Sequence, residues 1–460
     1  MTTESRRDRT VAGFSAWYAV AFLTLAASLS TIDRQVLALM IGPIKRDLAI
    51  NDSEIGLLGG LAFSLLYTAA TLPAAWIADQ RSRRTVITVA MLFWSAMTAA
   101  CGLTHRFFTL FLARMGVGLG EAALGPAAYS ILSDLFPKRS LPLAIGFYTA
   151  APFLGVGLAN ILGGAIVQHF ETAPPVILPV LGAMKSWQIL FLSLGLPGVV
   201  LAIVGRLTLK EPTRRGRVAG GDAAQPKPLT LAQIGAFLGG RRRFLALHFT
   251  AYVAMSIQGW GLFFWIVEIL VREHGMARAH AGLIYGSMAF ALGLAGSIVS
   301  GALASRLQAR GDAGGTMRLV LLCILALGPL AIIMPWAPQA WQVFALLVPI
   351  TFLMGWPGGL GTTALQFIVP NELKGRIIAL YLLVVNFISL TMGPLLGGLI
   401  SDRLFDGHAL GASLSLMAAV DYPVAAICLL LCLKPFGRAM DQAAAWETPS
   451  TPNPTLEPIP

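Results

Sequence analysis

Long runs of apolar residues alternate with short polar segments along almost the whole chain. A bilayer crossing takes about 20 apolar residues, and backbone polar groups in lipid must be satisfied within their own segment, so each run predicts a helix. The predicted helices cover residues 14–43, 55–78, 85–103, 107–132, 141–169, 187–207, 243–271, 282–305, 317–336, 340–369, 375–401 and 413–433. The pattern predicts an all-α membrane protein with twelve transmembrane helices, six in each half.

Polar stretches predict how the chain is divided. Residues 13–207 and 243–436 each form a predicted six-helix bundle, and the Pro-, Gly- and Arg-rich segment 208–242 links them. Within this linker the stretch LTLAQIGAFL favours a short amphipathic surface helix. Residues 1–12 form a polar N-terminal segment, and the tail 437–460, rich in Pro toward its end, is expected to be disordered.

Composition and charge narrow the class of protein. Of 460 residues, 56% are hydrophobic and 12% charged, against about 25% charged in soluble domains. This low fraction of charged residues excludes a soluble enzyme. The net charge of +11 does not indicate nucleic-acid binding, because the sequence predicts no soluble domain that could carry a basic surface. Of 33 Lys and Arg residues, 24 fall on the side that carries both termini and 7 on the other. The positive-inside rule therefore predicts cytoplasmic termini. The setting that we expect is the bacterial cell membrane.

The two halves resemble each other. GLLGGLAF at 56–63 matches GLIYGSMA at 282–289, and the same offset places Asp79 on Ser305. Repeated six-helix units related by a pseudo-two-fold axis are typical of transporters whose site lies near the bilayer midplane.

The clear cases of ionisable residues deep inside predicted spans are Asp33, Arg34, Arg114 and Glu121. Each costs at least about 2.5–3.5 kcal/mol at the bilayer centre, which makes it a functional candidate. Arg114 and Glu121 are two turns apart on one helix face, and Asp33 falls between them in height, so it could pair with either side of this couple. One reading is a site where Arg114 binds an anion while Asp33 and Glu121 carry a proton, with Arg34 as a supporting charge. The other is a static cluster that pins the first helix to the fourth.

A second charged motif, Asp79 followed by Arg81, Arg83 and Arg84, follows the second helix. An acid at a helix end beside clustered arginines can latch to a neighbouring helix in one conformation and release it in another. The positive-inside bias alone explains the arginines but not Asp79. We therefore interpret Asp79, Arg83 and Arg84 as a conformational latch.

Glycine and proline concentrate in several helices, most of all in GWPGGLG at 355–361. Pro357, Gly358 and Gly359 predict a hinge there, because two helix-disrupting residue types fall within one turn. For the other Gly-rich stretches, close helix packing explains the pattern equally well.

The second half carries few charges at depth, and its candidate cavity residues are polar or aromatic. They are His248, Gln258, Trp260, Phe264, Gln366, Tyr381 and Asn386. A charged half facing a polar and aromatic half favours a substrate with an ionic head and an apolar body. Glu268, near an outer helix end, is either a gate or an interfacial residue, and Asp421 receives no role.

These motifs resemble those of the Spinster branch of the major facilitator superfamily. The likeness is carried by STIDRQ at 30–35, ARMGVGLGEA at 113–122, SDLFP at 133–137 and the exit Lys210-Glu211-Pro212. It implies alternating-access transport with proton coupling through Asp33, Arg114 and Glu121, and animal members are associated with export of sphingosine-1-phosphate and lysophospholipids. The loop after the second helix departs from the superfamily pattern at Ala75, Gln80 and Ser82.

The sequence thus predicts a major facilitator fold and a monomeric secondary transporter, with no enzymatic activity, cofactor or metal. Its predicted substrate is an amphipathic anionic lipid of the lysophospholipid or sphingosine-1-phosphate class, with protons and membrane lipids as partners. The alternative is proton-linked uptake or efflux of a small organic anion or drug-like compound. A sensor or passive pore is disfavoured, because the chain offers no output domain and no repeated charge ring.

Overall fold

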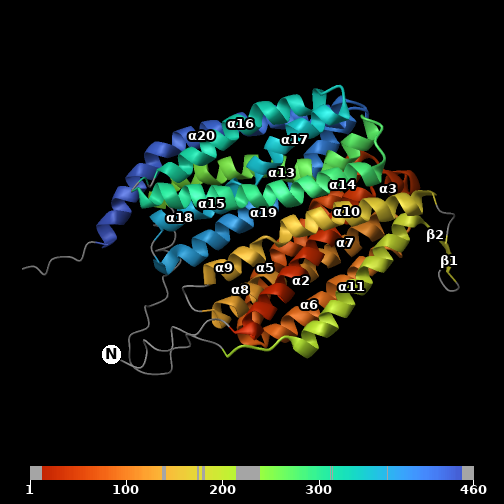
Figure 1. The fold of residues 1–460 in the computed structure, drawn as a ribbon, viewed down its shortest axis with the longest axis horizontal. Coiled ribbons are helices and arrows are strands. Elements are labelled where there is room, and N and C mark those ends of the chain that lie inside the picture. Colours follow the sequence, from red (N-terminus) through yellow and green to blue (C-terminus); the bar gives the residue numbers. More distant parts are fainter. Residues whose placement is uncertain are drawn as a thin grey trace, which may run out of the picture.

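The computed structural model describes residues 13–136, 141–172, 176–178, 182–213, 239–310, 312, 314–369 and 371–447. Within them, eleven helices are long and apolar enough to cross a membrane, and a shorter apolar helix, Ala340–Met354, accompanies them. The helices form two groups that lie side by side (Figure 1). We call the group from α2 to α11 the N half and the group from α13 to α20 the C half.

The N half follows the predicted spans but divides several of them. It contains α2 (Phe14–Leu39), α3 (Ile41–Leu48), α4 (Asp52–Gly59), α5 (Leu61–Gln80), α6 (Arg83–Cys101), α7 (Phe107–Glu121), α8 (Leu124–Leu135), α9 (Leu141–Thr149), α10 (Ala151–Thr172) and α11 (Ser186–Thr208). Local capping sets two of the starts. Asn51 and Glu54 form a capping box at α4, and the Ser82 hydroxyl accepts from the Thr85 amide at α6. A small hairpin, β1 (Val176–Leu178) and β2 (Gly182–Met184), lies between α10 and α11.

The C half has the same general plan. It contains α13 (Arg242–Arg272), α14 (Arg278–Met288), the π-helix η1 (Ala289–Gly293), α15 (Leu294–Ala309), α16 (Gly315–Ile333), the 3-10 helix η2 (Met334–Trp336), α17 (Ala340–Met354), α18 (Pro357–Ile368), α19 (Asn371–Leu404) and α20 (Leu410–Glu447). The helix breaks at Gly355 and Trp356, and Pro357, Gly358 and Gly359 open α18. The helix is therefore interrupted within GWPGGLG, where Pro357 takes the first position of α18. The hinge role of these residues stays a prediction.

One predicted boundary is wrong. Helix α20 continues through residues 437–447, where a disordered tail was expected. The stretch is rich in Ala and other strong helix formers, whose intrinsic propensity extends the helix despite Pro435. The predicted surface helix in the linker and the N-terminal segment 1–12 lie outside the described residues.

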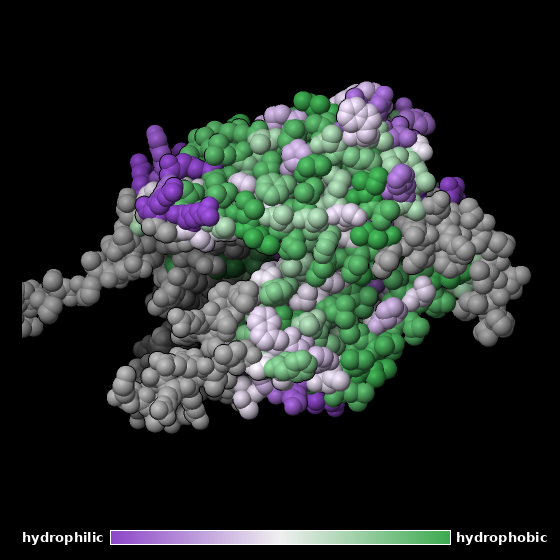
Figure 2. Space-filling model, viewed as in Figure 1, coloured by the Kyte–Doolittle hydropathy of each residue, from purple (hydrophilic) through white to green (hydrophobic). Residues whose placement is uncertain are grey.

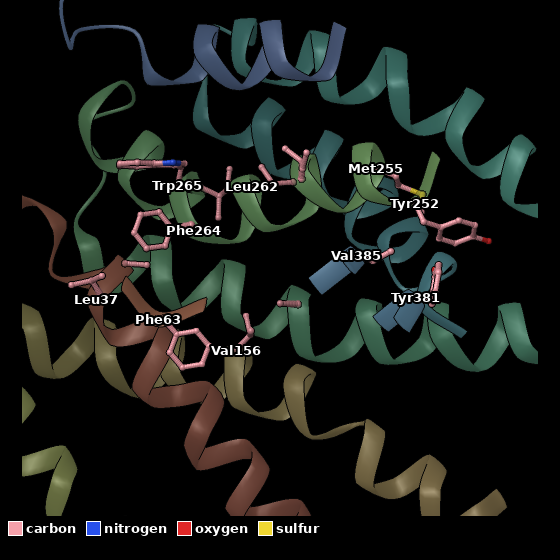
Figure 3. Close-up of a cluster of buried hydrophobic side chains, with 14 of the residues drawn as sticks. Leu37, Phe63, Val156, Tyr252, Met255, Leu262, Phe264, Trp265, Tyr381 and Val385 are labelled. Carbon is pink, nitrogen blue, oxygen red and sulfur yellow. The ribbon is translucent and has the colours of Figure 1, made fainter. Parts of the chain in front are cut away.

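Glycines let the two halves approach closely at one end. A Cβ atom on Gly56 of α4 would lie 2.6 Å from the Pro394 carbonyl oxygen of α19, and one on Gly286 of α14 would lie 2.8 Å from the Gly157 carbonyl oxygen of α10. Such spacings admit only glycine without a shift of the backbone. Buried residues of both halves, including Phe63, Val156 and Phe264, join one hydrophobic cluster (Figure 3). For these glycines, close packing is the structural role.

At the opposite end the surface is hollowed between the halves, as Figure 2 shows at its left side. Helix α20 ends on that side, whereas α3 lies at the closed end (Figure 1). The molecule is therefore open toward the side that carries the end of α20 and closed at the other.

Candidate functional site

Glu121, at the end of α7, lies against α2. Its Oε2 atom accepts a 2.6 Å hydrogen bond from the Ser30 hydroxyl and lies 3.4 Å from Nε of Arg34. The side chain is 3% exposed. The sequence placed Glu121 in a couple with Arg114 on its own helix face. That pairing is wrong in this structure, because the guanidinium of Arg34 on the adjacent helix is nearer to the carboxylate.

Arg114 is 1% exposed and holds its charge without a carboxylate partner among the described residues. Its Nη1 atom donates to the backbone oxygen of Asp33 at 3.2 Å. Its Nε and Nη2 atoms are buried and make no hydrogen bond to any described residue. Buried polar groups almost always have partners, so this guanidinium is held in place with two donors still unused.

Asp33 completes the group. Its Oδ2 atom accepts a 3.4 Å hydrogen bond from the Thr98 hydroxyl, while Oδ1, like Oε1 of Glu121, is buried without a partner in the described part of the chain. We call Asp33, Arg34, Arg114 and Glu121 the N-half charge cluster. The structure brings together the four residues that the sequence selected, but with different pairings.

Phe63 of α5 lies beside both arginines of this cluster. The guanidinium carbons of Arg34 and Arg114 are 5.1 Å and 5.8 Å from its ring centroid, within cation–π range. The side chain of Arg34 is 22% exposed, so it is the member of the cluster that reaches open space. Sequence reasoning missed Ser30, Phe63 and Thr98. Only Ser30, four residues before Arg34 on one helix face, carried a local signal.

Several predicted cavity residues of the C half are packed inside it instead. His248 is fully buried, with ring centroids 4.6 Å from Tyr252 and 5.5 Å from Tyr381, and Figure 3 shows these tyrosines. Gln258 is 2% exposed and donates to the Leu414 oxygen at 3.3 Å. The cavity role predicted for His248, Gln258 and Tyr381 is therefore wrong in this conformation. Their side chains are buried between helices of the C half and do not line an open space.

The remaining C-half candidates have different positions. Phe264 is buried against Gly59 of α4 and so belongs to the closed end between the halves. Trp260 and Asn386 are half-buried and stay candidates for the open side. Gln366 lies in α18, and its side chain falls outside those that the structure describes.

Arg83 is the centre of the charged motif that follows the second predicted helix. It is 1% exposed and forms ion pairs with Asp134 of α8 and with Glu211, the latter at 2.9 Å. It also donates to the Pro212 oxygen at 2.9 Å, and Arg84 contacts Glu211 through its backbone amide. Burial opposes ionisation of Glu211, but hydrogen bonds from Arg84, Ser82 and Arg83 outweigh it and lower the pKa of this carboxyl.

In this conformation the acid predicted for the motif is not engaged, which a latch that is released in one of its conformations allows, and the latch role of Asp79 stays a prediction. Asp79 is exposed and makes no hydrogen bond or ion pair with any described residue. Asp134 and Glu211 take its place, because they approach Arg83 from α8 and from the segment after α11. All these partners lie in the N half, so in this conformation the motif fixes one half internally.

At the closed end, ion pairs join the two halves. Asp52 of α4 is fully buried and accepts from Nη1 and Nη2 of Arg272 on α13, at 2.9 Å and 3.0 Å. Lys45 also pairs with Asp52. Glu268 accepts from Arg272 Nε at 2.6 Å and from Arg278 Nη1 at 2.7 Å. We call Lys45, Asp52, Glu268, Arg272 and Arg278 the interhalf ion network.

A second link lies beside it. Asp402 of α19 accepts from the Ser53 amide at 2.6 Å and from the Asp52 amide at 3.2 Å. A carboxylate of the C half thereby caps the N-terminus of α4 in the N half. The question left open for Glu268 is answered structurally: it belongs to the closed end. Sequence reasoning missed Asp52 and Arg272, which are 220 positions apart.

Comparisons with known proteins agree with this architecture. Residues 23–394 match the model of the Major Facilitator Superfamily, and the chain belongs to that family. It is 28% identical to an "MFS-type efflux pump" of Mycolicibacterium smegmatis, over 90% of this chain and 92% of that protein. It is 27% identical to a "Probable L-galactonate transporter" of Escherichia coli, over 67% of this chain and 65% of that protein.

Two further similarities concern the Spinster group. The "Sphingosine-1-phosphate transporter SPNS2" of Mus musculus is 32% identical over 37% of this chain and 32% of that protein. A solved bacterial homologue of the human lysosomal transporter Spinster, described as inward-facing and unoccupied, has a TM-score of 0.76 and 23% identity. That match covers 96% of this chain and 100% of the solved chain. The fold is thus the twelve-helix major facilitator fold with a Spinster-like neighbour.

Proposed function

We propose that this transporter moves an amphipathic anionic lipid or lipid-like solute, of the lysophospholipid or sphingosine-1-phosphate class, in a proton-coupled cycle. The observation that carries the proposal is Arg114, a buried guanidinium with two unused nitrogen donors. A static salt-bridged cluster would place a carboxylate on these donors. An arginine held by a backbone oxygen alone is instead suited to donate hydrogen bonds to a carboxylate or phosphate group of a substrate.

Proton coupling follows from the two acids beside it. Asp33 and Glu121 are almost fully buried, and each retains one oxygen atom without a partner among the described residues. Burial disfavours the charged form of a carboxylate, whereas a nearby cation favours it. When a substrate anion engages Arg114, its negative charge offsets that of the guanidinium, and protonation of a neighbouring acid becomes easier.

The closed end supports alternating access. The interhalf ion network and the glycine crossings hold one side shut while the other side is hollowed (Figure 2). With the termini cytoplasmic, as the distribution of Lys and Arg predicts, this is the inward-open conformation. The protein would act as a monomer of two bundles, 13–207 and 243–436, in a bacterial inner membrane. Pro357, Gly358 and Gly359 would bend α17 against α18.

The apolar part of the substrate would contact aromatic side chains near the cluster. Phe63 lies beside both arginines, and Trp260 remains half-buried on α13. The similarity to a protein named as a sphingosine-1-phosphate transporter supports the same class.

A second candidate is a small organic anion, supported by relatives named as galactonate and galactarate transporters. Purified protein in liposomes with an imposed pH gradient separates the two. The lipid proposal expects gradient-driven movement of lysophospholipid or sphingosine-1-phosphate and none of hexonates. Movement of hexonates alone would replace it with the second candidate.

A further inference from the structure

A basic hollow lies where α13 begins beside α20. It has a volume of about 680 Å³ and is lined by Gly239, Gly240, Arg241, Arg242, Arg243, Phe244, Leu430, Leu431, Lys434, Pro435, Arg438 and Ala439. Five of these residues are cationic and none is acidic. The hollow falls in the size range of small-ligand sites.

Four of the cations that line this hollow have no carboxylate partner among the residues that the structure describes. Arg242, Arg243, Lys434 and Arg438 are exposed and form no ion pair with a described residue. Arg318, by contrast, lies near the end of another helix on the same predicted side and pairs with Asp312. General positive-inside bias scatters such residues along the membrane edge. Here they converge on one concavity.

The walls of the hollow are fixed in position. The rings of Phe244 and Phe436 stack with centroids 5.7 Å apart, and the Cys432 thiol lies 3.7 Å from the Phe244 oxygen. Both contacts join α13 to α20. The cationic side chains are therefore presented from two helices whose separation is set by packing.

An apolar path continues from the charges along α20. Leu430 and Leu431 are 51% and 49% exposed, and they precede Lys434 by about one helical turn. Lys434 and Arg438 are themselves one turn apart on the same face. The order along the helix, apolar residues and then cations, follows the order of acyl chain and headgroup in a bilayer leaflet.

We propose that this hollow binds the phosphate-bearing headgroup of an anionic phospholipid from the surrounding leaflet, with its acyl chains on Leu430 and Leu431. Basic pockets between helix ends on the cytoplasmic side are suited to such headgroups. The ligand is a structural lipid held at the outside of the C half, separate from the N-half charge cluster and independent of the transported substrate.

Thermal unfolding of the full-length protein in detergent, followed by tryptophan fluorescence, tests the site. Phosphatidylglycerol is titrated against phosphatidylcholine as the neutral lipid. The variant Arg243→Gln/Arg438→Gln is compared with Arg306→Gln/Arg310→Gln, which removes two exposed arginines on the same predicted side but outside the hollow. Phosphatidylglycerol should raise the unfolding midpoint of the unmodified protein and of the Arg306/Arg310 variant. Its apparent affinity should fall about tenfold in the Arg243/Arg438 variant.

An equal response of both double variants to phosphatidylglycerol would overturn the proposal. So would an equal rise of the midpoint with inorganic phosphate, which would indicate a site for soluble anions. If the Arg243/Arg438 variant does not fold, the unmodified protein still decides the question. Added NaCl should weaken the effect of phosphatidylglycerol but not that of phosphatidylcholine, and an effect that salt leaves unchanged would contradict an ionic headgroup site.

Discussion

The N-half charge cluster and the interhalf ion network both bury charges, but they differ in how completely those charges are paired. In the network, each oxygen of Asp52 and Glu268 has a donor. In the cluster, Asp33, Arg114 and Glu121 each keep polar atoms without a partner among the described residues. A satisfied buried network stabilises one arrangement, whereas an incompletely satisfied one is the place for a ligand or proton.

The network and the cluster also differ in which helices they join. The network joins α4 to α13, and thus one half to the other, so it depends on the conformation of the transporter. The cluster joins α2, α6 and α7 of a single half. A rigid-body movement of the halves would break the network and leave the cluster intact. Whether the interhalf ion network is formed therefore depends on the conformation, whereas the N-half charge cluster moves as a unit with the N half.

The largest effect is expected for Arg114→Gln. Loss of the two free donors should lower substrate binding and all modes of transport by about 100-fold or more, because hydrogen bonds to a charged group contribute about 1.5–3 kcal/mol each. Folding should be retained, since among the described residues only the bond to the Asp33 oxygen and the contact with the Phe63 ring are lost. Substrate counterflow measures transport, and the midpoint of thermal unfolding measures whether the fold is retained. A variant that loses its fold along with transport would make Arg114 a structural residue and erase the contrast with the network.

Glu121→Gln should have a narrower effect. Gradient-driven flux should be abolished while counterflow, which needs no net proton movement, survives. The amide still accepts the hydrogen bond from Ser30, so the fold is retained. Ser30→Ala serves as the control that removes this bond but keeps the acid. Unchanged gradient-driven flux in the Glu121 variant would remove it from the coupling scheme.

Asp52→Asn should shift the conformational equilibrium. Removing one partner of a buried ion pair costs about 3–5 kcal/mol, and here the cost falls on the closed end. Ser64→Cys is a reporter, because Ser64 is fully buried and bonds Thr391 across the halves. An impermeant maleimide applied from the side of the closed end should label this cysteine much faster in the Asp52 variant. Equal labelling rates would show that the network does not control closure.

The smallest effect is expected for Lys185→Gln at the same end. Lys185 pairs with Asp47 at 2.9 Å, but its side chain is 52% exposed and both residues lie in the N half. An exposed ion pair contributes about 0–1 kcal/mol. Labelling of the Ser64→Cys reporter should stay at the unmodified rate. An acceleration like that of the Asp52 variant would mean that any charge at this end, rather than the interhalf pairing, sets closure.

The sequence by itself determined the spans, the break before Pro357 and the four residues of the N-half charge cluster. These are local properties, because hydropathy over one helix length decides insertion and a charge in an apolar run is visible without knowing its neighbours. Motifs that resemble those of the Spinster branch also pointed to the superfamily, to which the match over residues 23–394 shows that the chain belongs.

Only the tertiary structure decided the partners. Glu121 pairs with Arg34 rather than Arg114, Arg83 with Asp134 and Glu211 rather than with Asp79, and His248 packs inside its half. Pairing depends on how each helix is rotated about its axis and on which helices lie beside it, and neither is encoded in the hydropathy of a single segment. The ion pair between Asp52 and Arg272 also depends on the relative position of the two halves. It exists in this arrangement of the two halves, so it is set by the conformation as well as by the fold.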